Sequence, residues 1–79
     1  MDEKRMNEYK MLGLNIAYYR RIRGLSQLTL AEKANLSRTF ISCIEAPNIT
    51  TNLTLESLFN IADALEVPAY KLLSFDKID

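Results

Sequence analysis

Hydrophobic residues recur along this chain at steps of three and four residues, the spacing that places side chains on one side of an α-helix. The first such segment is expected to run from Asn7 to Arg23, and Gly24 stands where helices commonly end in a left-handed residue. No repeat, low-complexity run or flexible linker divides the 79 residues. The pattern therefore predicts an all-α fold in a single domain spanning residues 1–79.

The next segment resembles one long amphipathic helix that is interrupted at Asn35, Leu36 and Ser37. Asparagine enters the left-handed conformation at low cost and can close a helix, whereas serine can cap the first turn of a following one. Ser26 is a matching cap at the start of the segment. The interruption therefore predicts a tight turn between two short helices, which together form a helix-turn-helix over about residues 26–46.

The second of these short helices has two distinct sides when its residues are placed at about 100° per residue. Phe40, Ile41 and Ile44 fall together and are expected to face the core. Pro47 is expected to stop the helix shortly after this apolar side ends. The outward side carries small or hydrogen-bonding residues and one arginine: Arg38, Thr39, Ser42, Cys43 and Ala46.

Two further helices are expected after a loop. Thr54 can cap the fourth helix, and Pro68 suits the first turn of a fifth, which Leu72 and Leu73 would anchor. The fold is thus expected to hold five helices, with residues 1–6 and 76–79 flexible. The apolar side of the fourth helix, expected to join the core, comprises Leu55, Leu58, Phe59, Ile61, Ala62 and Leu65.

The residue types that are missing exclude several kinds of active site. The chain has no histidine, and Cys43 is its single cysteine. Nucleophiles paired with histidine, intrachain disulfides and zinc sites of clustered cysteine and histidine cannot be built from this inventory. We expect no enzymatic activity, no metal, no cofactor and no small-molecule substrate.

The location of the protein is predicted from its apolar runs. None is long enough to span a membrane, and the charged start MDEKRMNEYK lacks the apolar segment of a signal peptide. We therefore expect no membrane partner and a cytoplasmic location.

The formal net charge is zero, yet the charges are unevenly distributed. Residues 1–40 hold eight basic and four acidic residues, a surplus of four, whereas residues 41–79 hold two basic and six acidic residues, a deficit of four. This asymmetry favours one positive face that can meet phosphates, although scattered solvated charges are the alternative interpretation.

The run GLSQLTLAEKANLSRTFISCIE, from Gly24 to Glu45, resembles the Cro and phage-repressor (XRE-type) DNA-binding family. NLSRTFISCIE and NLTLESL are most similar to restriction-modification controller proteins within it. The resemblance implies a compact five-helix, lambda-repressor-like domain that binds double-stranded DNA. It also implies a transcriptional regulator that acts as a homodimer on a near-palindromic operator. The positions that carry the family pattern are Gln27, Ala31, Asn35, Ile41 and Ile44.

The resemblance also implies roles for particular residues. Arg38 would read guanine through two hydrogen bonds, and Gln27 would contact a phosphate and brace Arg38. Arg20 and Glu45 would form a structural ion pair, whereas Arg21 and Arg23 would attract phosphates diffusely or be solvated. The expected DNA-binding set is Gln27, Ser37, Arg38, Thr39, Ser42, Cys43 and Asn48.

Two alternatives stay open at this stage. Tyr70, Leu73 and Phe75 exceed what a small core can absorb and are expected to form the dimer interface, although they could be core residues. The zero net charge also allows a protein-interaction module of the same fold, such as an antitoxin or an anti-repressor with weak DNA binding. Steep salt dependence of binding would favour the regulator.

Overall fold

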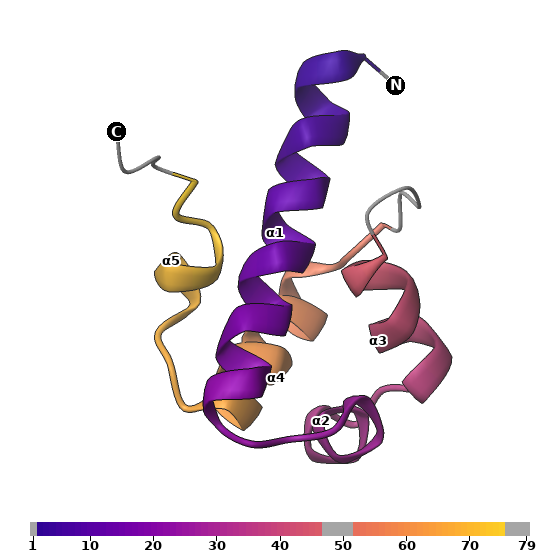
Figure 1. Ribbon diagram of the computed structural model, residues 1–79, viewed down its shortest axis with the longest axis vertical. Coiled ribbons are helices and arrows are strands. Elements are labelled where there is room, and N and C mark those ends of the chain that lie inside the picture. The colour runs from indigo at the N-terminus through magenta and orange to yellow at the C-terminus, as the bar shows by residue number, and fades with distance from the viewer. Residues whose placement is uncertain (1, 47–51, 76–79) are drawn as a thin grey trace.

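The computed structural model describes residues 2–46 and 52–75. The described residues form five α-helices and no strand, so the predicted all-α class is confirmed. Figure 1 shows α1 as the long central helix, with α3 on one side, α5 on the other and α2 across its far end. The helices are α1 (Glu3–Ile22), α2 (Gln27–Ala34), α3 (Arg38–Glu45), α4 (Leu55–Leu65) and α5 (Ala69–Leu72).

The first helix begins four residues before the predicted Asn7. The Asp2 side chain accepts a hydrogen bond from the Arg5 backbone N–H at 2.8 Å, so a carboxylate satisfies one of the free amides of the first turn. At the other end Gly24 has a φ of 70°, as predicted for the residue that closes this helix.

The corner between α2 and α3 has the predicted capping chemistry. Asn35 is left-handed, with φ 59° and ψ 43°, and the Leu36 N–H donates to the Ala31 carbonyl at 2.8 Å. The Ser37 hydroxyl then accepts from the Phe40 N–H at 3.0 Å and opens α3. The two short helices and the turn between them are thereby confirmed as a helix-turn-helix.

The core lies where α1, α2, α3 and α4 meet, and α5 closes one side of it. Gly13 allows α1 to approach α3 closely, because a Cβ added there would lie 2.1 Å from the Ile44 carbonyl oxygen. The largest fully buried side chains are Ile16, Leu30, Ile41, Ile61, Leu65 and Leu72.

Two residues that were expected in the core are exposed. Leu55 and Phe59 of α4 are 67% and 51% exposed, because they lie on the flank of the helix rather than on the side that faces the other helices. The prediction was therefore wrong for both. Leu73 is also exposed, since α5 ends one residue earlier, so it does not anchor the last helix, but its exposure is compatible with the dimer interface predicted for it.

Arg23 ties the first helix to the end of the fourth. Its guanidinium donates from Nε to the Leu65 carbonyl at 2.7 Å and from Nη2 to the Glu66 carbonyl at 3.0 Å. These are carbonyls at the C-terminal end of α4 that have no partner within the helix, and a cation is favoured there. The structure thus gives Arg23 a structural task, whereas we expected phosphate attraction or plain solvation.

Asn15 holds the last described segment against α1. Its side-chain amide donates to the Leu72 carbonyl at 2.9 Å and to the Ser74 carbonyl at 3.1 Å. Two carbonyls at the end of α5 are thereby satisfied by one side chain.

Candidate nucleic-acid interface

The outward side of α3 presents the residues predicted to bind DNA. Arg38 and Thr39 are exposed at the start of the helix, and Ser42 and Cys43 are half-buried further along. Ser37 precedes them, with its hydroxyl engaged as the helix cap. These side chains form a continuous polar edge, which we call the α3 edge and define as Ser37, Arg38, Thr39, Ser42 and Cys43.

The orientation of the α3 edge is fixed by the opposite side of the helix. Ile41 and Ile44 are buried in the core, and Phe40 packs against it. The close approach of Gly13 to the Ile44 carbonyl adds a backbone contact. Because well-packed side chains do not shift freely, the α3 edge is held in one direction relative to α1.

Arg20 of α1 and Glu45 of α3 lie together and form a bidentate ion pair. Nε donates to Oε2 at 2.8 Å and Nη2 to Oε1 at 3.0 Å, while Nη1 donates to the Leu25 carbonyl at 2.8 Å. The two side chains are only 12% and 5% exposed. The hydrogen bond to Glu45 and its negative charge raise the pKa of Arg20, against the opposing effect of burial, so Arg20 stays charged.

Gln27, the first residue of α2, joins this ion pair. Its side-chain amide donates to Oε1 of Glu45 at 3.0 Å, so it points at Glu45 rather than bracing Arg38 as we expected. One carboxylate therefore links α1, α2 and α3. No local pattern marks the link between Gln27 and Glu45, because the two residues are 18 positions apart and only the fold brings them together.

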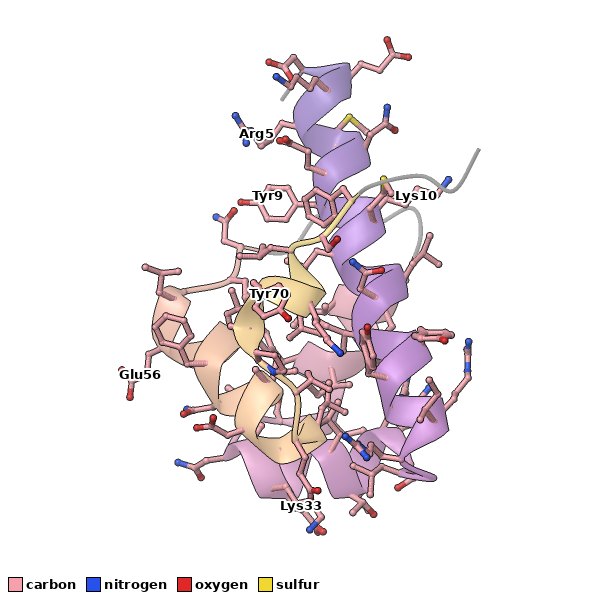
Figure 2. All side chains as sticks on the ribbon, turned by 90° about the vertical axis from the view of Figure 1, so that its left-hand side faces the viewer. Arg5, Tyr9, Lys10, Lys33, Glu56 and Tyr70 are labelled. Atoms are coloured by element: carbon pink, nitrogen blue, oxygen red, sulfur yellow. The ribbon has the colours of Figure 1, made fainter. Side chains whose placement is uncertain are left out.

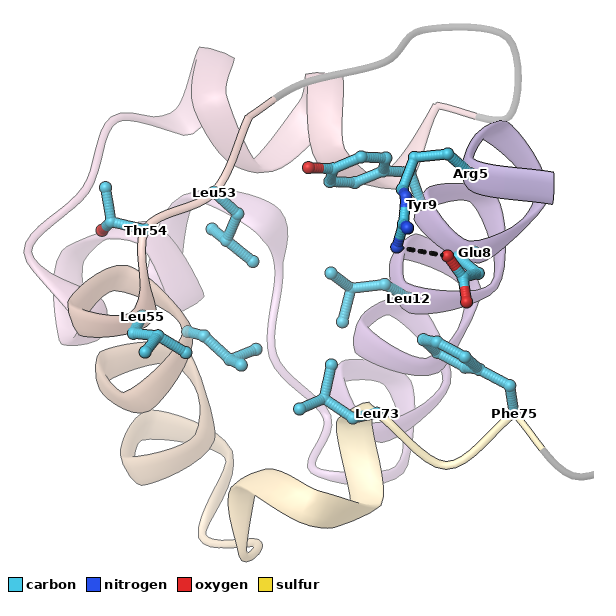
Figure 3. A pocket seen from close by; sticks show the side chains of 10 residues that line it. Arg5, Glu8, Tyr9, Leu12, Leu53, Thr54, Leu55, Leu73 and Phe75 are labelled. Atoms are coloured by element: carbon cyan, nitrogen blue, oxygen red, sulfur yellow. Dashed lines mark hydrogen bonds and ion pairs between the residues drawn. The ribbon is translucent and has the colours of Figure 1, made fainter. Parts of the chain in front are cut away.

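The residues expected at a dimer interface lie apart from the α3 edge. Tyr70 and Leu73 are exposed, whereas Phe75 is half-buried, and Figure 1 shows α5 on the opposite side of α1 from α3. Leu73 and Phe75 line a pocket of about 260 Å³ between α1, the start of α4 and the last described segment (Figure 3). Exposed Leu55 stands on the same pocket, and an ion pair between Arg5 and Glu8 lies beside it.

No group of three or more cysteine or acidic side chains in residues 2–46 and 52–75 is placed to hold a metal ion. Over the same residues no helix combines the length and the apolar character needed to cross a membrane. Asn48 and Pro47, for which we made predictions, lie outside the described residues, as do residues 76–79.

Most of the chain matches a known protein family. A model described as helix-turn-helix matches residues 16–72, which include α2, α3 and the corner between them. The chain belongs to this helix-turn-helix (XRE-type) family. The resemblance inferred from residues 24–45 is thereby confirmed.

Individual relatives agree with this assignment. The control protein C.SmaI of Serratia marcescens is 39% identical over 69 residues, which cover 87% of this chain and 80% of that protein. The transcriptional regulator SinR of Bacillus subtilis is 36% identical over 63 residues, covering 80% of this chain. The chain spans little more than half of SinR, since the match covers 56% of that protein. These relatives are regulators and controller proteins rather than enzymes.

Solved structures show the same arrangement of helices. The restriction-modification controller protein C.AhdI from Aeromonas hydrophila matches with a TM-score of 0.78 and 27% identity, over 84% of this chain and 97% of that one. The N-terminal DNA-binding domain of SinR from Bacillus subtilis matches with a TM-score of 0.75 and 35% identity, over 82% and 93% of the two chains.

Proposed function

We propose that this protein is a sequence-specific DNA-binding transcriptional regulator that acts as a homodimer on a near-palindromic operator. The observation that carries the proposal is the α3 edge, an exposed polar surface on a helix whose other side is locked into the core. The DNA-binding domain of SinR, which is similar in structure, supports the same function. Because the named relatives come from bacteria, where DNA lies in the cytoplasm, the proposal includes a cytoplasmic location.

The proposal assigns different tasks to the residues of the α3 edge. Arg38 is exposed at the start of the helix and long enough to give a bidentate hydrogen bond to guanine O6 and N7. Thr39, beside it, meets a base edge or a thymine methyl group. Ser42 and Cys43, which are half-buried, make shorter contacts with the groove wall.

Phosphate contacts complete the proposed interface. Gln27, Ser37 and Asn48 are assigned to the DNA backbone, where contacts fix the register of the protein without reading sequence. The hydrogen bond from Gln27 to Glu45, the last residue of α3, holds its amide at the start of α2. One donor hydrogen of that amide remains for a phosphate oxygen.

The proposed dimer uses the apolar side of the protein that carries α4 and α5. Its surface, which we call the α4/α5 face, comprises Leu55, Phe59, Tyr70, Leu73 and Phe75. Support comes from the exposure of the first four and from the pocket that Leu55, Leu73 and Phe75 line together. The pocket of about 260 Å³ beside Leu55 and Leu73 offers space for an apolar side chain of the second copy. A two-fold dimer would set both α3 helices into successive major grooves, about 34 Å apart.

Binding-site selection from random duplex DNA tests this function. We expect the wild-type protein to enrich a dyad-symmetric site, and Arg38→Ala to lose preference at one base pair in each half-site, a cost of about 1–3 kcal/mol. Arg21→Ala is the matched control, since it removes an exposed arginine from α1 and should keep every base preference. If the wild type enriches no symmetric site, the regulator proposal fails. If Arg38→Ala keeps full preference, Arg38 is not a base reader.

A salt titration separates the proposed regulator from a protein-interaction module of the same fold. Affinity for the selected site should fall steeply with salt, with a slope of roughly 0.9 for each phosphate neutralised in a plot of log affinity against log salt. A nearly flat plot would favour the interaction module instead.

A further inference from the structure

The short segment after α5, residues 73–75, forms one wall of the pocket on the proposed dimer face. Leu73 and Phe75 line this pocket, and its other walls come from α1 and from the start of α4 (Figure 3). Figure 2 views the protein from the side that carries α5, with Tyr70 pointing out from it. The shape of the pocket therefore depends on where residues 73–75 lie. We call residues 73–75 the α5 tail.

The main chain of the α5 tail has few contacts of its own. Helix α5 is four residues long, which is too short for a helix to be stable by itself. The Leu73 N–H donates to the Tyr70 carbonyl at 3.1 Å, and among the described residues no main-chain hydrogen bond involves Ser74 or Phe75. A segment with so few contacts opens at a low cost in free energy unless another group ties it down.

Asn15 connects the α5 tail to α1. Its half-buried side-chain amide donates to the Leu72 carbonyl at 2.9 Å and to the Ser74 carbonyl at 3.1 Å, so one amide can use both of its donor hydrogens. The two acceptors stand on either side of Leu73 in the sequence. The hydrogen bonds therefore fix the main chain before and after the residue that lines the pocket.

The place of Asn15 on α1 suits this connection. Glu8, Leu12 and Asn15 follow one another at steps of four and three, so they lie on the same side of the helix. Glu8 and Leu12 line the pocket, and Asn15 extends this side of α1 toward the α5 tail. Because Leu12 is buried in the core, α1 is a firm support for the side chain of Asn15.

Phe75 provides a second contact, of a different kind. Its side chain is half-buried and packs against the core. An apolar contact has no preferred direction, whereas a hydrogen bond to a carbonyl requires a defined distance and angle. Phe75 thus keeps the α5 tail near the core, and Asn15 determines how its main chain is oriented.

We propose that Asn15 is a positioning residue for dimer formation. It holds the α5 tail in the place that leaves the pocket open to an apolar side chain of the second copy. This inference rests on the proposed dimer, and it assigns a task to a residue that lies outside the α4/α5 face. In a two-fold dimer each copy contributes one pocket, so both tails must be in place.

The two-fold symmetry sets the size of the effect. Loss of two hydrogen bonds shifts the docking equilibrium of the α5 tail about tenfold or more toward the detached state. The apparent dissociation constant rises by the inverse of the docked fraction for each copy, and by its square for the pair. A docked fraction of about one third therefore raises the dissociation constant roughly tenfold.

Asn15→Ala tests the inference. The change removes both hydrogen bonds, and alanine is a better helix former than asparagine, so α1 should stay intact. We expect sedimentation to show a dimer dissociation constant raised about tenfold or more. Asn7→Ala removes an exposed asparagine of the same helix and is the matched control, which should leave the constant unchanged. If Asn15→Ala dimerises as tightly as the wild type, the inference is wrong.

Amide hydrogen exchange of the monomer separates positioning from a general loss of stability. In Asn15→Ala the Leu73 amide should exchange several-fold faster than in the wild type, on the order of the tenfold shift in docking. The amides of the buried residues Ile16 and Ile61 should keep their wild-type rates. Faster exchange at all three positions would mean that the whole fold is loosened, which would overturn a positioning role.

The wild-type protein distinguishes failure of this inference from failure of the proposed dimer. A wild type that does not self-associate overturns the dimer, and the positioning role with it. If the wild type dimerises and the Leu73 amide exchanges equally fast in Asn15→Ala, the dimer stands and the role of Asn15 is wrong. Two Asn15→Ala copies joined by a flexible linker reach an effective concentration of about millimolar and should bind the selected DNA site as linked wild-type copies do. Weaker binding by the linked variant would overturn a role confined to dimer formation.

Discussion

The ion pair between Arg20 and Glu45 yields the sharpest test of how the fold is held. Glu45→Ala removes the acceptor of three hydrogen bonds, two from Arg20 and one from Gln27, and leaves a guanidinium in a site where its side chain is only 12% exposed. Removing one partner of a buried ion pair costs about 3–5 kcal/mol. A chain of 79 residues has a total stability of about 4–12 kcal/mol, so the variant should lose at least about a quarter of it.

Thermal melting followed by circular dichroism measures this loss. For a domain of this size each kcal/mol lowers Tm by about 4–8 °C, so Glu45→Ala should lower it by at least about 12 °C. The matched control is Glu8→Ala, which breaks the ion pair with Arg5, whose side chains are 59% and 34% exposed. An exposed pair contributes less than about 1 kcal/mol, because water solvates both charges once they separate. A fall for Glu45→Ala no larger than for Glu8→Ala would refute the reasoning.

A double replacement distinguishes a buried charge from lost packing. Arg20→Met combined with Glu45→Leu removes both charges and keeps the volume, so it should recover most of the stability that Glu45→Ala loses. If the double variant is instead less stable than Glu45→Ala, the ion pair itself contributes net stability, and burial of an unpaired charge does not explain the loss.

Three further outcomes follow from the structure. Gly13→Ala should lower the free energy of unfolding, measured in urea, by about 1–3 kcal/mol, because its Cβ would meet the Ile44 carbonyl. An unchanged urea midpoint would contradict the close contact of α1 and α3. Asn35→Gly should change the free energy of unfolding by less than about 0.5 kcal/mol, whereas Asn35→Ala should lower it by about 1 kcal/mol, because alanine is strained at a φ of 59°. Equal melting temperatures of the two variants would contradict a left-handed corner. Leu55→Gln combined with Phe59→Gln should raise the dimer dissociation constant, measured by sedimentation, at least about tenfold without lowering the Tm of the monomer. An unchanged dissociation constant would place the interface elsewhere.

Local chemistry made the corner predictable from the sequence. Asn35 and Ser37 act on backbone groups within a few residues of themselves, and their capping preferences do not depend on the rest of the fold. The inward direction of Ile41 and Ile44 followed from the helical period alone. Short-range rules were therefore enough for the helix-turn-helix and for the exposed α3 edge.

Contacts between distant segments were harder to predict. The hydrogen bonds of Arg23 reach residues 42 and 43 positions away, and no local pattern marks such a bond. The exposure of Leu55 and Phe59 was missed for a related reason. The helical period identifies the apolar side of α4, but the positions of the neighbouring helices decide how much of that side is covered.

The close approach of Gly13 to the Ile44 carbonyl has a consequence for engineering. Because α3 is seated partly by main-chain contact and by Ile41 and Ile44, the exposed side chains of Arg38 and Thr39 are not needed for its placement. Residues 38 and 39 can therefore be exchanged while the scaffold stays the same, whereas the half-buried Ser42 and Cys43 tolerate only side chains of similar size. A library randomised at the two exposed positions and selected against new operators would retune specificity without redesigning the domain.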